Sequence, residues 1–185
     1  MEKKISLVWV LSIVAMLAVM MMGLRPVMAA NLVGVDDDVR AALSKLYDHT
    51  PAAKALGEKA KAILVFPTVV KAGFLFGGQY GHGELLKGGK MDGYYNIAAA
   101  SYGLQAGIQS FAYVMFLMTD SAVTYLENTE GFEIGVGPSV VIVDEGMAKT
   151  LTTSTAQESI YGFIFGQKGL MAGVGLQGSK ISRIR

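Results

Sequence analysis

The C-terminal segment contains a glycine spacing that is typical of a dinucleotide-binding turn. Gly173, Gly175 and Gly178 follow one another as G-x-G-x-x-G. That motif requires a helix that opens on it and an acidic residue about 20 positions later. The seven residues after Gly178 contain no acid, and the stretch GELLKGGKM lacks both the first glycine and the Ser or Thr of a phosphate-binding loop. We therefore expect no nucleotide ligand.

Other residue types that perform chemistry do not form a recognisable site. His49 and His82 are far apart and have no carboxylate at metal-ligand spacing, and the chain has no cysteine. The acidic run 36–38 lacks the glycine and glutamate of a calcium loop. No G-x-S-x-G elbow and no distinctive carboxylate pair occur. The sequence predicts a protein without enzymatic activity, metal or cofactor.

The charges are segregated along the chain. Without residues 1–30 the net charge is −1, from 13 basic and 14 acidic residues, which argues against nucleic-acid binding. Basic residues nevertheless gather before position 90 and after position 158, and clustered Lys and Arg attract phosphate groups. We predict an anionic partner, with candidate lipid-binding residues Lys54, Lys59, Lys61, Lys71, Lys168, Lys180, Arg183 and Arg185.

The N-terminal segment has the layout of a secretory signal peptide. Lys3 and Lys4 precede a long apolar run, and VMAA offers small residues for cleavage after Ala29 or Ala30. We expect residues 1–30 to be a signal peptide and residues 31–185 to form one domain, exported to the periplasm or secreted. The alternative is a retained membrane anchor, because the apolar run approaches the length of a bilayer span.

The mature segment reads as two helices followed by strands with one inserted helix. Apolar periodicity and N-terminal signals predict helices at 35–50, 51–62 and 119–130. The run AILVFP is predicted to stop at Pro67, and KGGK and MDG are predicted turns. The stretch Phe111–Met118 predicts a buried central strand, with a membrane-contacting face as the alternative. This order indicates an α+β fold.

The glycines indicate the shape of the sheet. Gly81 and Gly83, Gly135 and Gly137, and Gly173 and Gly175 are each two residues apart, so each pair shares one strand face. Glycine on one face allows sharp bending and close approach of another backbone. We expect a strongly coiled, mainly antiparallel sheet or partial barrel.

Three blocks resemble the hallmark segments of the SYLF lipid-binding domain family. They are ILVFPTVVKAGFLFGGQYGHGELL, SYGLQAGIQSFAYVMFLMT and KGLMAGVGLQGSKI, in the family's order. Eukaryotic members of this family bind phosphoinositides, and some bind actin. The resemblance therefore implies lipid binding. Bacterial members are mostly exported, and no catalytic residues are established for the family. Actin is not expected as a partner of an exported bacterial protein. Members often carry basic residues before K-G-L, where this chain has Gly166 and Gln167.

Two classes of function remain open from the sequence. The first is a lipid-binding module of the bacterial cell envelope, peripherally associated with anionic membrane lipid. The second is a structural or protein-interaction protein of the envelope without a lipid ligand. An outer-membrane β-barrel would fit the length and the aromatic and glycine content, but the N-terminal helices, the non-alternating Phe111–Met118 run and the basic C-terminus argue against it.

Overall fold

The computed structural model describes residues 34–128, 132–133, 140–143 and 157–184. The predicted signal peptide and its cleavage site lie outside these residues, as do Gly135, Gly137 and Arg185. No helix in the described part of the chain has the length and apolar character needed to cross a bilayer.

Three helices in the described part of the chain accompany the sheet, close to the predicted positions. They are α2 (Val35–His49), α3 (Pro51–Gly57) and α4 (Asp120–Asn128). The Thr119 hydroxyl caps α4 by accepting a hydrogen bond from the Ala122 amide at 3.2 Å. The second helix was predicted to reach residue 62, which is wrong: it ends at Gly57, a poor helix former, and Lys59 and Lys61 follow in the connection to the sheet.

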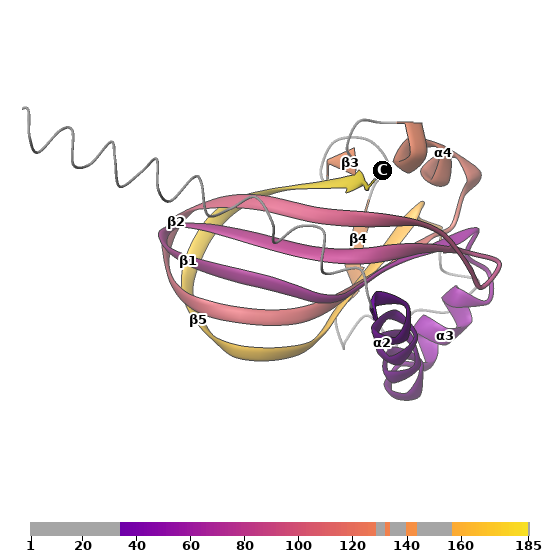
Figure 1. Cartoon of the computed structure of the whole chain (residues 1–185), viewed down its shortest axis with the longest axis horizontal. Helices are drawn as coiled ribbons and strands as arrows, with labels where there is room; N and C mark the ends of the chain where they lie inside the picture. The colour runs from indigo at the N-terminus through magenta and orange to yellow at the C-terminus, as the bar shows by residue number, and fades with distance from the viewer. Residues whose placement is uncertain (1–33, 129–131, 134–139, 144–156, 185) are drawn as a thin grey trace, which may run out of the picture. The chain divides into compact units, whose positions relative to one another are not determined.

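Three very long strands form the sheet: β1 (Ala62–Lys87), β2 (Lys90–Leu117) and β5 (Ile160–Arg183). β2 is central and pairs antiparallel with both neighbours. The short strands β3 (Phe132–Glu133) and β4 (Val140–Val143) pair with β5, antiparallel and parallel respectively. Figure 1 shows how strongly the three long strands curve. The α+β fold with a coiled, mainly antiparallel sheet is therefore confirmed.

Two predicted breaks are wrong. β1 continues through Pro67, because a register shift between Phe66 and Val69 takes the proline out of the regular hydrogen-bond ladder. The MDG segment lies inside β2. The β1–β2 turn is made by Gly88 and Gly89 alone, whose φ values of 55° and 76° favour glycine.

The sheet folds over on itself, and glycine makes this possible. A Cβ atom on Gly83 would lie 2.1 Å from the Val65 carbonyl oxygen, and one on Gly81 would lie 2.7 Å from that of Thr68. The first part of β1 therefore crosses directly over its last part. The predicted role of Gly81 and Gly83 in close backbone approach is confirmed.

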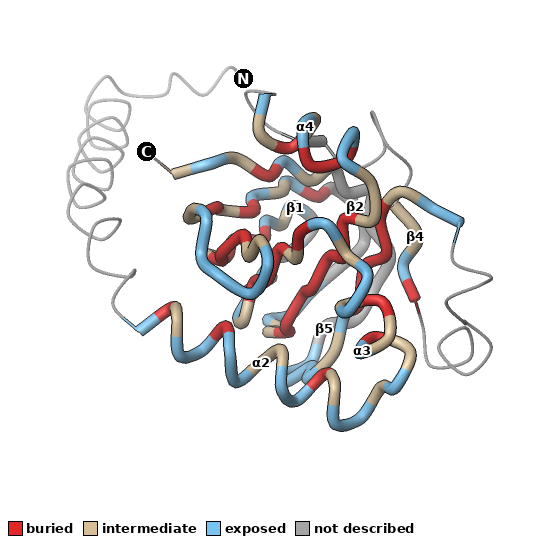
Figure 2. The backbone as a smooth tube through the Cα atoms, turned by 90° about the vertical axis from the view of Figure 1, so that its right-hand side faces the viewer, coloured by how far each residue is buried: buried red, intermediate tan, exposed pale blue. Residues whose placement is uncertain are grey.

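The main core fills the inner face of this fold. It joins side chains from both ends of the long strands to the apolar side of α4. Residues 111–117 are all buried, which confirms the central buried strand. On the outer face at the same end, Phe116 stacks on Tyr47 of α2 and meets Phe163 edge to face. The tube in Figure 2 shows buried positions along this end of β1 and β2, and α2 buried on one side only.

Candidate functional site

The outer face of the sheet is apolar yet exposed where the strands bend. The pairing register places Ile108 beside Leu170, and the neighbouring rows carry Val70 and Phe74. Leu170 is 88% exposed, Phe74 76% and Ile108 62%. We call Val70, Phe74, Ile108 and Leu170 the outer patch. In Figure 1 the bend lies at the opposite end of the sheet from α2, α3 and α4.

Lysines border the outer patch. Lys168 of β5 is the register partner of Ser110 of β2, which in turn pairs with Val70 of β1. This row lies next to the row of Ile108 and Leu170, and the Lys168 side chain is exposed. Rows on one face of a sheet are about 7 Å apart. The Lys168 ammonium group is therefore within reach of any surface that the outer patch contacts.

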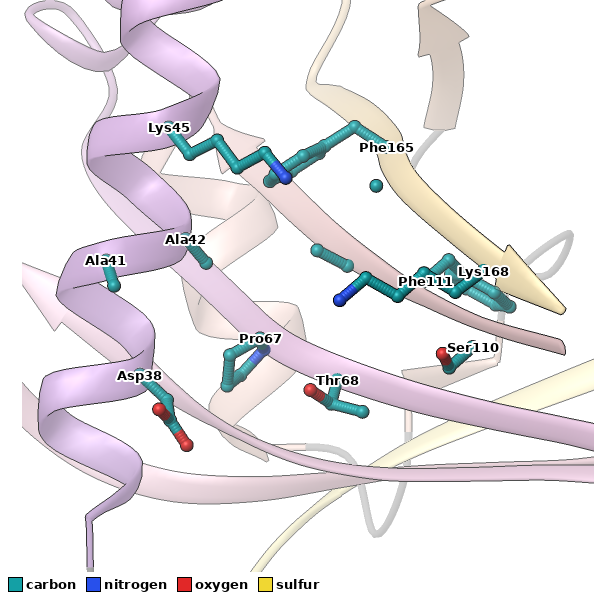
Figure 3. Close-up of a pocket in the computed structure, with 12 residues that line it drawn as sticks. Asp38, Ala41, Ala42, Lys45, Pro67, Thr68, Ser110, Phe111, Phe165 and Lys168 are labelled. Atoms are coloured by element: carbon teal, nitrogen blue, oxygen red, sulfur yellow. The ribbon is translucent and has the colours of Figure 1, made fainter.

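A cavity of ≈ 280 Å³ lies between α2 and the outer sheet face, next to the outer patch. Figure 3 shows Lys45 of α2 reaching across it towards β5, with Lys168 on its other side. The Lys45 ammonium nitrogen is 3.7 Å from the position that a Cβ on Gly166 would occupy. The hydroxyl groups of Thr68 and Ser110 also line the cavity, and Asp38 is the one acid among its described lining residues. Two cations and two hydroxyl groups make this cavity suited to a phosphate group.

A carboxyl pair fixes α2 on the sheet and so positions Lys45. Glu84 of β1 is 2% exposed, and burial, together with its hydrogen bond to Asp36, raises its pKa to about 7. Asp36 in the first turn of α2 also accepts a hydrogen bond from the Tyr94 hydroxyl at 2.9 Å. The hydrogen bonds from Glu84 and Tyr94 lower the pKa of Asp36. A protonated Glu84 therefore donates to an ionised Asp36.

The structure does not bring the predicted cations together. Lys54 lies on α3, and Lys59 and Lys61 follow that helix; Lys61 forms an exposed ion pair with Asp120 at 3.6 Å. Lys71 lines a separate cavity on the inner face. Lys180 pairs with Glu133 of β3 in the sheet register. Of the predicted residues, Lys168 alone borders the outer patch among those described.

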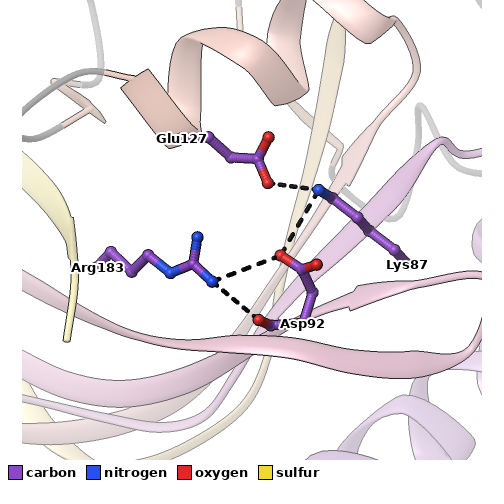
Figure 4. A network of polar contacts seen from close by, with 4 residues as sticks. All are labelled: Lys87, Asp92, Glu127 and Arg183. Carbon is purple, nitrogen blue, oxygen red and sulfur yellow. Dashed lines mark hydrogen bonds and ion pairs between the residues drawn. The ribbon is translucent and has the colours of Figure 1, made fainter. Parts of the chain in front are cut away.

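Arg183 belongs to a structural network at the β1–β2 turn. Its guanidinium group donates to the Asp92 carbonyl oxygen at 2.9 Å and lies 3.9 Å from the Asp92 carboxylate. Lys87 joins the same carboxylate at 3.6 Å and hydrogen bonds Glu127 of α4 (Figure 4). The bond to Glu127 is the main cause that raises the pKa of Lys87. This network ties α4 to the ends of β2 and β5.

The sequence analysis missed Lys45 and the outer patch. Lys45 lies seven residues after Asp38 with Ala41 and Ala42 between them, a spacing that puts all four on one helix face. Small residues followed by a lysine on one helix face could have indicated that Lys45 borders a cavity. Lys45 also supplies the charge that Gly166 and Gln167 do not provide before Lys168. The exposed apolar positions gave no signal, because they alternate on strands in the same way as core residues.

The fold and this surface define a class of α+β domains built on a folded-over antiparallel sheet. Residues 98–184 match the family model described as Ysc84: Las17-binding protein actin regulator. This match to the Ysc84 (SYLF) domain family model confirms the resemblance seen in the motifs of the chain. The match supports a lipid-binding or actin-regulator-like domain. A search of the curated proteins found no match.

The matched segment includes part of the site. It contains Ile108, Lys168 and Leu170, whereas Lys45, Val70 and Phe74 precede it. The structure joins both groups on one face, since β1 pairs with β2 along nearly its whole length.

Proposed function

We propose that this chain is a non-enzymatic lipid-binding domain of the bacterial cell envelope, which docks on anionic phospholipid through the outer patch. The observation that carries the proposal is the exposure of Phe74, Ile108 and Leu170 beside the cationic cavity of Lys45 and Lys168. Exposed apolar side chains gathered on one face mark an interaction site rather than ordinary surface. The adjacent positive charge favours a partner that is apolar and anionic at once, as an anionic membrane surface is.

The two parts of the site contribute in different ways. Apolar side chains that leave water gain roughly 1.5–3 kcal/mol each when fully buried. Each lysine near an anionic leaflet adds about 1 kcal/mol, and this attraction falls off within a Debye length. The cavity between Lys45 and Lys168 is where a phosphoinositide-type or other phospholipid head group would be held. The predicted signal peptide is the reason for proposing the periplasm or the exterior, with peripheral membrane association.

A protein partner is the second candidate. The description of the matching family names Las17 binding and actin regulation, and an apolar patch rimmed by lysines also suits a protein surface. In that case the chain is a structural or interaction protein of the envelope. Actin is not proposed as its partner, because the proposed location separates it from the cytosol.

Vesicle co-sedimentation tests the proposal. Neutral vesicles and vesicles with added phosphatidylglycerol are compared at low and physiological salt, with the Lys45→Ala/Lys168→Ala double variant beside wild type. Losing two lysines costs about 2 kcal/mol, so affinity for anionic vesicles should fall roughly 30-fold at low salt. All variants carry the same N-terminal segment, so differences between them report the site.

The matched control is Lys54→Ala/Lys59→Ala, which removes two exposed lysines at and after α3. This variant should bind as wild type does. An equal loss of vesicle affinity in both double variants would show that total positive charge, and not this site, drives binding. Wild-type protein that binds neutral and anionic vesicles equally, or neither, would favour the protein-interaction alternative.

A further inference from the structure

A second cavity, of ≈ 380 Å³, lies on the inner face of the folded sheet. It is lined by Lys71 and Gln79 of β1, and by Gln109, Phe111 and Tyr113 of β2. Lys71 and Gln109 are register partners on the face that carries the main core, opposite to the outer patch. This cavity is therefore separate from the proposed docking surface.

The lining is divided by polarity. The polar side consists of Lys71 and the side-chain amides of Gln79, Gln109 and Gln167, with the Ser179 hydroxyl, which accepts a weak hydrogen bond from Gln79 at 3.4 Å. The apolar side consists of Phe111, Ile142, Ile164 and the Tyr113 ring. No Asp or Glu occurs among the described lining residues. One cation, amide donors and an apolar wall together suit an anion with a hydrocarbon body.

The Tyr113 hydroxyl points to a ligand. Tyr113 is 3% exposed, and its hydroxyl group has no hydrogen-bond partner among the described residues. Burial raises the pKa of Tyr113, so the hydroxyl keeps its proton. Buried polar groups in native proteins nearly always have a partner. A bound molecule with a polar group near Tyr113 would supply the one that is missing here.

The position of this hydroxyl sets the length of the ligand. The Tyr113 hydroxyl oxygen lies 3.1 Å from the point that a Cβ on Gly162 would occupy. The end of the Ile142 side chain lies 2.9 Å from the same point. Gly162 pairs with Met115, so the hydroxyl leans away from Gln109 and Lys71. Gln109 and Tyr113 are four residues apart on one strand, which corresponds to about 13 Å. An extended chain of about eight carbons spans roughly 10 Å.

We propose that this cavity binds a medium-chain fatty carboxylate that carries a hydroxyl group towards its far end. The carboxylate pairs with Lys71 and the neighbouring glutamine amides, because a carboxylate accepts several hydrogen bonds. The hydrocarbon body packs on Phe111, Ile142 and Ile164. The ligand hydroxyl exchanges a hydrogen bond with Tyr113. This assignment does not depend on membrane docking.

Titration calorimetry with three eight-carbon probes tests the assignment. Octanoate supplies the carboxylate alone, 8-hydroxyoctanoate adds the far hydroxyl, and octylammonium reverses the charge. Wild-type protein should bind both carboxylates, with 8-hydroxyoctanoate about tenfold tighter, and should not bind octylammonium. Lys71→Met should weaken both carboxylates about tenfold. Tyr113→Phe should remove the advantage of 8-hydroxyoctanoate and leave octanoate unchanged.

Fold and site effects are separated by controls. Tyr113→Phe removes a hydroxyl group that has no hydrogen-bond partner in the described part of the chain, so it should keep or raise the melting temperature. Lys168→Ala, on the outer face, should bind both carboxylates as wild type does while it weakens vesicle binding. Failure of both carboxylates to bind wild type, equal binding of octylammonium, or a hydroxyl advantage that survives in Tyr113→Phe would overturn the assignment.

Discussion

The ends of the long strands and their bend carry the same kinds of apolar residues but have opposite surroundings. On β2, Phe116 and Ile108 are eight residues apart and both face outwards, yet Phe116 is fully buried and Ile108 is exposed. The difference lies in what covers them: Tyr47 of α2 stacks on Phe116, whereas the helices lie at the other end of the sheet from the bend (Figure 1). An apolar strand face is therefore buried core where a helix packs on it and exposed surface where none does.

Truncation of one phenylalanine in each region, the covered end and the bend, should test this comparison most clearly. Phe116→Ala removes a fully buried ring that contacts Tyr47 and Phe163, and should lower the free energy of unfolding by about 3–5 kcal/mol. Phe74→Ala at the bend should change it by no more than about 0.5 kcal/mol. Urea unfolding measures both. Similar losses at the two positions would mean that the outer patch is part of the packed core.

Adding a methyl group tests the crossing of β1 over itself. A Cβ on Gly83 would meet the Val65 carbonyl oxygen and the Phe66 ring, so Gly83→Ala should destabilise the fold by about 1–3 kcal/mol. Gly78 near the bend is the matched control, since its Cβ would meet one atom, the Ala99 carbonyl oxygen, at 3.3 Å. Gly78→Ala should therefore cost much less. Thermal unfolding of both variants checks this, and equal melting temperatures would argue against the crossing.

The Glu84–Asp36 pair makes the covered end sensitive to pH. Because the folded-state pKa of Glu84 is raised to about 7, the folded protein holds a proton that the unfolded chain has released. Stability should fall as pH rises from about 4.5 to 7, by at most about 1.4 kcal/mol per pH unit, and then level off. The lowered pKa of Asp36 acts in the opposite sense at more acidic pH.

Glu84→Gln is the matched variant for this prediction. A glutamine can still donate to Asp36 but does not ionise, so its stability should stay level across the same pH range. Denaturant unfolding at pH 5 and pH 8 compares the two proteins. A wild-type protein that is equally stable at both values would contradict the buried, protonated Glu84.

The exposed ion pair Lys61–Asp120 should have the smallest effect. Its ammonium nitrogen and carboxylate oxygen are 3.6 Å apart, and both side chains are well exposed. Exposed pairs contribute about 0–1 kcal/mol, so Lys61→Ala should lower stability by less than about 1 kcal/mol. A double-mutant cycle with Asp120→Ala measures the coupling. A coupling well above that value would show that this connection holds the helices to the sheet.

The sequence predicted the helices and strands better than it predicted which strand faces other elements bury. Periodicity located all three described helices, and glycines two apart predicted the close approach that Gly81 and Gly83 make. It could not predict that β1 continues through Pro67, because the register shift depends on pairing with β2. It also could not distinguish Ile108 and Leu170 from core residues. Alternation shows which residues share a strand face, but not whether another element packs on that face. Lysine clustering in sequence likewise failed to predict which cations meet: Lys45 and Lys168 are 123 positions apart.

Site-specific labelling tests the central proposal most directly. The chain has no cysteine, so Leu170→Cys and, as a control at an exposed position of α4, Thr124→Cys each carry a single environment-sensitive fluorophore. With phosphatidylglycerol vesicles, we expect the label at position 170 to shift to the blue and to be quenched by nitroxide groups within the bilayer. The label at position 124 should not change. A label at position 170 that stays in water while the protein is bound to vesicles would contradict docking through the outer patch.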